Sequence, residues 1–418
     1  MYTDNSSYTK VDRPVSEILQ DWEKNYGTLW RWDKFFPYPS IKSISLPNAY
    51  TLFKNKSLLK YRPITSYAAH PYKRLFNATA RALNFILEKC TAKHFNLAKI
   101  CNFKKVISGF NDTLKEHDYN FESVTGDLAN MYTNLDHDSI RTAVRWVLYE
   151  TKKCGLRDRR CVSVPVSKSD NSVRYGHSVA ADGSRINLTY DELLEIVCFD
   201  LDNSFFTIGD FVGKQTCGIP MGSPISPALA VIVCAYYENK IFKAVNDWGW
   251  ANTNTIMGTR YMDDVLAFVT HDGSDISRLR AKYLLEIIKD GYHDQMVLEC
   301  EDTSVPFKFL STTVTTVSGK PIYFKYFSKN IESISSRGVQ DFLTFQHYGS
   351  ISPPSQKISV VISALHRICM NSTSVSDFDV AVSNIFEELS LLKYPKSILN
   401  KALSRVKLHS RYSTLSTI

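Results

Sequence analysis

Two adjacent carboxylates, Asp263 and Asp264, stand inside an otherwise apolar stretch of the sequence, preceded by Tyr261 and Met262. The alternation of apolar and polar residues over 256–270 predicts a β-hairpin with the two acids at its tip. Neighbouring carboxylates in an apolar setting are costly unless a cation neutralises them. Oxygen ligands of this kind suit Mg²⁺, which keeps some waters and accepts substrate phosphates. An exposed acidic turn is the plainer interpretation of these residues alone, but the apolar strands on both sides favour a metal site.

A third carboxylate lies upstream, at Asp127, where a strand-like stretch over 121–127 ends. Phosphoryl transfer assisted by two metal ions needs carboxylates from separate strands that converge on ions about 4 Å apart. Taken in isolation, Asp127 is better explained as a turn residue or a helix N-cap. Taken with Asp263 and Asp264, it predicts a three-carboxylate metal site.

A loop rich in glycine and proline lies between these segments, over residues 213–227, and an apolar helix is predicted after it over 228–240. Gly218 and Gly222 would let the backbone approach a ligand closely, and the prolines stiffen the loop. The loop is therefore a candidate cradle for a nucleotide and a template base. The alternative is an ordinary junction between a loop and a helix.

The elements that must position these residues are mixed. Helices are predicted at about 72–90, 136–152 and 276–290, strands over 297–327, and mainly helices over 340–410. Residues 153–190 are rich in Arg, Lys, Ser, Asp and Gly, which predicts a protruding hairpin or insertion. A chain of 418 residues suits two or three packed subdomains of α+β architecture.

The overall composition permits a polyanionic partner without requiring one, since the net charge is +8. The nine cysteines include no Cys-x-x-Cys pair, which argues against a disulfide framework and a structural zinc site. We therefore expect an intracellular reducing compartment, with nucleus, cytoplasm and organelle all left open. No apolar run reaches the roughly 18 residues that a membrane span needs, and the polar N-terminus does not resemble a secretory signal.

Read in order, the Asp127 segment, the 218–227 loop and the 261–264 turn resemble the three palm motifs of reverse transcriptases. Downstream, the segments at 347–350, 364–367 and 393–395 resemble the region after the palm in Penelope-like reverse transcriptases. The GIY-YIG endonuclease that often follows Penelope-like enzymes is not visible, and neither is a clear RNase H set of acidic residues.

The resemblance implies a right-hand polymerase fold with fingers, an antiparallel palm sheet and a mainly helical thumb. The implied regions are an N-terminal aromatic extension at 1–45, fingers at 46–120, a palm at 121–300 with the insertion at about 150–190, a primer-grip region at 301–335, and a thumb at 336–418.

The resemblance also implies roles for individual residues. Mg²⁺ or Mn²⁺ would be held by Asp127, Asp263, Asp264 and the carbonyl of Leu128, and Tyr132 would be a steric gate that favours deoxynucleotides. The nucleotide-binding residues would be Arg62, Lys60, Lys54, Lys56, Tyr132, Gln215, Gly218 and Met221. Phe309 and Leu310 would form the primer grip, and Lys289 is the candidate general acid.

The function implied is that of an RNA-directed DNA polymerase, a nucleotidyltransferase that extends a DNA or RNA primer on an RNA template with dNTPs. One alternative is an RNA-dependent RNA polymerase. Viral members usually carry Gly-Asp-Asp where this chain has Met-Asp-Asp, and a second Asp where it has Tyr132. Another is a domesticated, inactive palm domain that serves as an RNA-binding scaffold, although all three carboxylates are present. A mobile element and a host gene both remain open.

Overall fold

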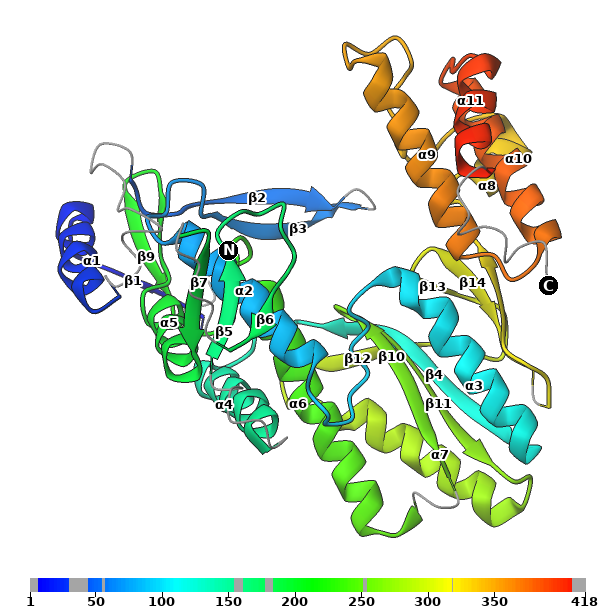
Figure 1. Ribbon diagram of the computed structural model, residues 1–418, viewed down its shortest axis with the longest axis horizontal. Coiled ribbons are helices and arrows are strands. Elements are labelled where there is room, and N and C mark those ends of the chain that lie inside the picture. The colour runs from blue at the N-terminus through cyan, green and yellow to red at the C-terminus, as the bar shows by residue number, and fades with distance from the viewer. Residues whose placement is uncertain are drawn as a thin grey trace. The chain divides into compact units, whose positions relative to one another are not determined.

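The computed structural model describes residues 7–29, 44–54, 57–153, 161–176, 183–250, 254–317 and 319–407. The chain divides into two compact units, each built from separate stretches (Figure 1). The first unit comprises residues 1–96, 128–249 and 287–299, and the second comprises 97–127, 250–286 and 300–418. The mixed α+β architecture expected from the sequence is confirmed.

The first unit contains a five-stranded sheet in the order β1-β9-β8-β2-β3. Its strands are β1 (Tyr8–Lys10), β2 (Asn48–Lys54), β3 (Ser57–Ser66), β8 (Phe205–Ile208) and β9 (Phe211–Gln215). The N-terminal strand β1 is an integral edge of this sheet, because Tyr8 pairs with Gln215 in antiparallel register. The sheet therefore joins segments that are about 200 residues apart in the chain.

Five helices pack in the same unit. They are α1 (Val15–Leu29), α2 (Lys73–Glu88), α4 (His137–Lys153), α5 (Tyr190–Asp202) and α6 (Ser226–Asp247). The predicted apolar stripe of α2 is buried, from Leu75 to Leu87, and α6 packs against both α2 and α4. Of the N-terminal aromatic residues, Trp22 is buried against the rings of His70 and Tyr72. Trp30, Trp32, Phe35 and Phe36 lie outside the described residues.

A protruding hairpin or an insertion was predicted over 153–190, and the part that the structure describes does contain antiparallel strands, but its central strand is buried and does not protrude. A three-stranded sheet forms there from β5 (Cys161–Pro165), β6 (Arg174–Tyr175) and β7 (Arg185–Thr189). Every residue of β5 is buried, and the strand packs against α2. Arg81 of α2 donates to the carbonyl of Pro165 over 2.8 Å. The polar composition of the region concealed β5, because that strand is short, mostly apolar and followed by the exposed polar segment 167–172.

The second unit contains most of a sheet whose strand order is β10-β11-β4-β12. Its strands are β10 (Ile256–Tyr261), β11 (Asp264–His271), β4 (Asn120–Ala129) and β12 (Val297–Glu301), and the nearby helices are α3 (Phe103–His117) and α7 (Asp275–Asp290). The predicted 256–270 hairpin is confirmed. Helix α3 is not among the predicted helices; it packs an aromatic face on the sheet, with the Phe110 and Phe268 ring centroids 4.9 Å apart.

The C-terminal part of the second unit begins with a three-stranded sheet of β13 (Phe307–Phe309), β14 (Thr312–Thr315) and β15 (Tyr323–Tyr326). Four helices follow, α8 (Ile331–Arg337), α9 (Pro354–Met370), α10 (Val375–Leu391) and α11 (Lys396–Lys407). The prediction of mainly helical structure over 340–410 is therefore confirmed. None of the helices in the described part of the chain is both long and apolar enough to cross a membrane.

Candidate active site

The two-residue turn between β10 and β11 holds the sharpest sequence feature. Tyr261 and Asp264 form the last pair of the antiparallel ladder, so Met262 and Asp263 make the turn. Met262 has φ +59°, a left-handed conformation that costs a residue with a side chain about 1 kcal/mol. The fully buried Arg260 guanidinium donates to the Met262 carbonyl over 3.0 Å and offsets part of that cost. The turn is thus held in one shape from inside the unit.

Asp264 lies directly opposite Asp127 on the neighbouring strand β4, in antiparallel register. Residues paired in this way have Cβ atoms about 5 Å apart and project from the same face of a sheet. The register is fixed beneath them, where the Thr125 hydroxyl donates to the Val265 carbonyl over 2.9 Å. Two carboxylates from strands far apart in sequence therefore face one another at the end of this sheet.

The electrostatics of this carboxylate pair favour a cation. Burial raises the pKa of Asp264 to about 7, and its hydrogen bond with Asp127 and the negative charge of Asp127 act in the same direction. The charges of Asp263 and Glu301 add to the effect. An all-oxygen donor set with this excess of negative charge fits a hard divalent ion such as Mg²⁺ or Mn²⁺.

Asp263 is exposed at the tip of the turn. Among the described residues, no three His, Cys, Asp or Glu side chains converge as a metal-ligand cluster. The structure therefore pairs Asp127 with Asp264, and Asp263 lies in the adjoining turn, near enough for its charge to act on Asp264.

The glycine-rich loop is fastened to the turn that follows β4. The Gly218 amide donates to the Leu135 carbonyl and the Ile219 amide donates to the Tyr132 carbonyl, both over 2.7 Å. Gly218 has φ +79°, and a Cβ atom there would lie 2.5 Å from the Thr133 carbonyl oxygen. Only glycine fits this position, because the Thr133 carbonyl cannot move away without breaking the turn.

The other end of the loop is fastened to strand β3. The Thr65 amide donates to the Met221 carbonyl over 2.8 Å. A Cβ atom on Gly222, which has φ +141°, would lie 2.0 Å from the Thr65 carbonyl oxygen. The loop and β3 are therefore in backbone contact, as expected for adjoining walls of a ligand pocket.

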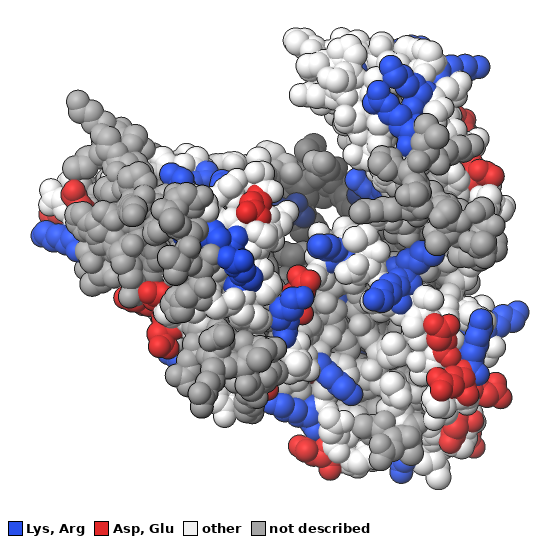
Figure 2. Space-filling view, in the orientation of Figure 1, with Lys and Arg blue, Asp and Glu red and all other residues white. Residues whose placement is uncertain are grey.

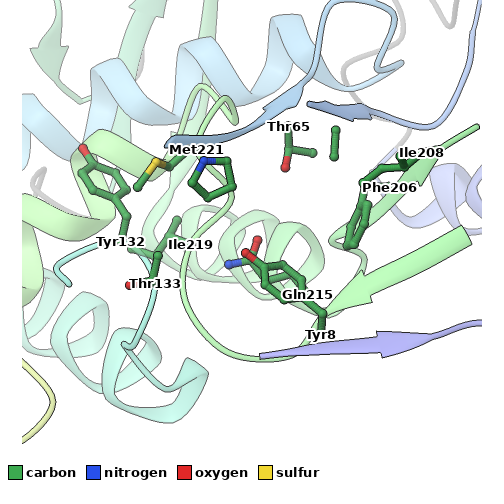
Figure 3. A pocket seen from close by; sticks show the side chains of 11 residues that line it. Tyr8, Thr65, Tyr132, Thr133, Phe206, Ile208, Gln215, Ile219 and Met221 are labelled. Carbon is green, nitrogen blue, oxygen red and sulfur yellow. The ribbon is translucent and has the colours of Figure 1, made fainter. Parts of the chain in front are cut away.

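A pocket opens between these walls (Figure 3). The predicted residues Tyr132, Gln215 and Met221 all line it, and Gly218 shapes it through its contact with the 132–133 backbone. Figure 3 shows Tyr132 and Met221 at one end of the pocket and Phe206 at the other. Ile219 and Pro63 also lie in segments that the sequence assigned to the nucleotide site, whereas the other lining residues were not expected: Tyr8, Ala49, Thr65, Thr133, Phe206 and Ile208. Alternate residues of a strand share a face, so Pro63 on a strand could have indicated that Thr65 lines the same pocket.

The predicted basic residues lie on the β2–β3 hairpin. Arg62 is exposed on β3, where it pairs with Leu52. Lys54 ends β2 and Lys60 lies within β3, but their side chains, and Lys56 as a whole, lie outside the described residues. The structure therefore gives the strand positions of these residues and no contacts for the three lysines.

The remaining predicted residues lie on other elements. Lys289 is in the last turn of α7, where a cation stabilises the helix end. Phe309 is 3% exposed, and its ring centroid lies 5.2 Å from that of Phe103, so it is a core residue beneath the turn. Leu310 occupies that turn with φ +55° and lines a second pocket, in the second unit. Of the two predicted primer-grip residues, Leu310 lines this pocket and Phe309 is packed in the core.

Comparison with known proteins adds one family match and a set of related folds. The model of the animal helix-turn-helix domain matches residues 344–404, which include α9, α10 and most of α11. No sequence among the curated proteins matches the chain.

Two telomerase structures, each in complex with a TWJ fragment of telomeric RNA, are similar to this chain. The Candida albicans telomerase superposes with a TM-score of 0.55 at 13% identity, over 95% of this chain and 62% of that one. The Candida tropicalis telomerase superposes with a TM-score of 0.50 at 13% identity, over 94% and 59%. The chain thus spans about three fifths of the length of these telomerases. At such identity the likeness establishes the fold, and the chain has the right-hand polymerase fold of fingers, palm and thumb, with an antiparallel palm sheet and a mainly helical thumb.

Proposed function

We propose that the chain is a nucleotidyltransferase that extends a primer with dNTPs on an RNA template, an RNA-directed DNA polymerase. The observation that carries the proposal is the pairing of Asp264 with Asp127 at the end of an antiparallel sheet in a right-hand polymerase fold. In the proposed reaction the primer 3′-oxygen bonds to the α-phosphorus of the dNTP. The bond from that phosphorus to the β-phosphate oxygen breaks, pyrophosphate leaves, and the hydroxyl proton passes to solvent.

Asp127, Asp263, Asp264 and the Leu128 carbonyl would hold the metal ions. Bound Mg²⁺ or Mn²⁺ would lower the pKa of the attacking hydroxyl and neutralise charge on the phosphates. The raised pKa of Asp264 supports this assignment, because a carboxylate pair that shares so much negative charge gains from a cation.

The pocket lined by Tyr132, Gln215 and Met221 would take the nucleotide. Tyr132 follows Asp127 by five residues, and its half-buried ring at one end of the pocket suits a steric gate against a ribose 2′-hydroxyl. Arg62, with Lys54, Lys56 and Lys60 from the same hairpin, would contact the triphosphate. Lys289 would be the general acid, and Leu310, supported by Phe309, would contact the primer.

An RNA template with a DNA or RNA primer would be held mainly through phosphate contacts. The chain carries 50 basic against 42 acidic side chains, and Lys and Arg are spread over the face shown in Figure 2. We further assign the chain to the Penelope-like reverse transcriptases. The segments at 347–350, 364–367 and 393–395 carry that resemblance, and all lie within the region matched by the helix-turn-helix model. The region boundaries predicted from the sequence are retained as part of this proposal.

Primer extension tests the proposal. Wild type with Mg²⁺ or Mn²⁺ should extend a DNA primer on a defined RNA template with dNTPs, and substitution of Asp264 by Asn should abolish the product. Asp112→Asn, which changes an exposed carboxylate on α3, is the matched control and should extend normally. Equal use of rNTPs would instead indicate an RNA polymerase. Binding of RNA without any extension would indicate an inactive scaffold.

A further inference from the structure

A buried carboxylate lies behind the nucleotide pocket of the first unit. Asp200, near the end of α5, is 2% exposed. Its two oxygens accept hydrogen bonds from the Tyr67 hydroxyl over 3.2 Å and from the Ser223 hydroxyl over 2.8 Å. In the described part of the chain no lysine, arginine or histidine pairs with it. A buried carboxylate without a cation costs folding free energy that an apolar side chain would not.

The two hydroxyls belong to the two walls of the pocket. Tyr67 comes two residues after Thr65, and Ser223 comes two residues after Met221. Thr65 and Met221 line the pocket and are joined to each other by a backbone hydrogen bond. Asp200 therefore links the same two segments, through residues that lie two positions beyond those that line the pocket.

Helix α5 is itself well anchored. Thr189 caps its start: the Thr189 hydroxyl accepts from the Glu192 amide, and the Glu192 carboxylate accepts from the Thr189 amide over 2.6 Å. At its other end the Ser204 hydroxyl donates to the Asp200 carbonyl over 2.7 Å. A carboxylate has only acceptors, one oxygen for each hydroxyl, so it can hold both walls at once.

We propose that Asp200 is a positioning residue for the nucleotide site, whose two carboxylate oxygens hold β3 and the 218–223 loop at the separation that nucleotide binding requires. This inference rests on the proposed function. It accounts for a hydrogen-bonded carboxyl group in a place where hydrophobic packing alone would satisfy stability.

The first measurement does not depend on activity. Hydrogen exchange is followed by mass spectrometry for peptides that cover 63–67 and 216–223. Asp200→Asn, which keeps the shape but offers one acceptor, should speed exchange of the Thr65 amide at least about tenfold, since that amide is bonded to the Met221 carbonyl. Asp202→Asn changes an exposed carboxylate on the same helix and is the matched control, expected to leave both peptides unchanged.

The second measurement is steady-state extension. Asp200→Asn should raise the KM for dNTP about tenfold with a smaller change in kcat, because the pocket loosens while the carboxylates that hold metal are intact. Ser223→Ala should reproduce this effect, and the double variant should be no worse than either single one. If Asp200→Asn fails to fold, the test rests on Ser223→Ala, which removes the hydrogen bond between Ser223 and Asp200.

The outcomes separate the two ideas. If the wild type never extends a primer, the proposed function is contradicted. The hydrogen-exchange data then still test whether Asp200 holds β3 and the 218–223 loop together. Unchanged exchange in both peptides for Asp200→Asn and Ser223→Ala would overturn the role of Asp200. Faster exchange throughout the unit would overturn it too, since that indicates general destabilisation.

Discussion

Asp264 and Asp127 face each other across two antiparallel strands, although 136 residues separate them in the chain. Replacement of either by Asn keeps the size of the side chain and removes the charge that a metal needs. We expect extension to fall at least about a thousandfold in each variant. Thermal unfolding should not report a less stable fold, because removing one carboxylate relieves the repulsion between the pair. A variant with a tenth of wild-type activity would contradict the metal-binding role.

The sugar selectivity of the pocket depends on one ring. Tyr132→Ala opens the end of the pocket that Tyr132 shares with Met221, so the preference for dNTP over rNTP should fall about 10- to 100-fold. The readout is the ratio of kcat/KM for the two nucleotides on the same primer and template. Tyr132→Phe keeps the ring and should keep the preference. An unchanged ratio in Tyr132→Ala would show that Tyr132 is not the steric gate.

Gly222 should be irreplaceable for a backbone reason. In Gly222→Ala the new methyl group would lie 2.0 Å from the Thr65 carbonyl oxygen, so the loop must leave β3. We expect a loss of several °C in Tm and a raised KM for dNTP. Gly109→Ala, in the middle of α3 with nothing within 4 Å, is the control, and it should gain about 0.5–1 kcal/mol from helix propensity. Equal Tm values for the two variants would refute the contact.

His70 should make the fold sensitive to acid. It is buried between the rings of Trp22 and Tyr67, and burial lowers its pKa from 6.5 to about 3. The unfolded chain then binds more protons than the folded one between these pH values. The stability that neutral His70 contributes is therefore present above pH 6.5 and is lost, by about 1.4 kcal/mol per pH unit, as the pH falls towards 3.

The measurement is the free energy of unfolding against pH for wild type and His70→Asn, whose amide oxygen can still accept the Tyr72 amide. Burial raises the pKa of Asp200 to about 7, so its contribution has the opposite sign: it is lost as the pH rises towards 7. Both proteins carry that term, and the difference between them isolates His70. The difference should change steeply between pH 6.5 and 3, whereas a parallel pair of curves would show that His70 is not the group involved. His117→Asn, at the exposed end of α3, should follow wild type.

Local pattern sufficed to predict the elements that carry the chemistry. The 256–270 alternation gave the hairpin, and the stripe from Leu75 to Leu87 gave α2, because each pattern repeats over a single element with one buried face. The burial of the strand at 161–165 was missed, because the exposed polar segment that follows it suggested a protruding element. Helix α3 was missed, and its stripe of Phe103, Ile107, Phe110 and Leu114 is visible only when the window begins at the right residue.

Long-range pairing is what the sequence could not supply. Nothing near Tyr8 indicates that it pairs with Gln215 and lines the same pocket as Tyr132. Asp200 carried no signal at all, because its significance comes from two hydroxyls that only the fold brings to it. Asp263 was grouped with the other acids by adjacency; its side chain is exposed at the tip of the turn, and its charge acts on Asp264.

The two-residue turn at Met262 and Asp263 makes chain length as important as residue type. Side chains alternate between the faces of a strand, so one extra residue between Asp264 and Val265 would move that carboxylate to the opposite face from Asp127. A substitution beside Asp264 leaves both carboxylates in place, whereas such an insertion separates the pair although every residue is retained. In an evolving lineage, the residues around the two aspartates should therefore tolerate substitutions far more readily than insertions or deletions.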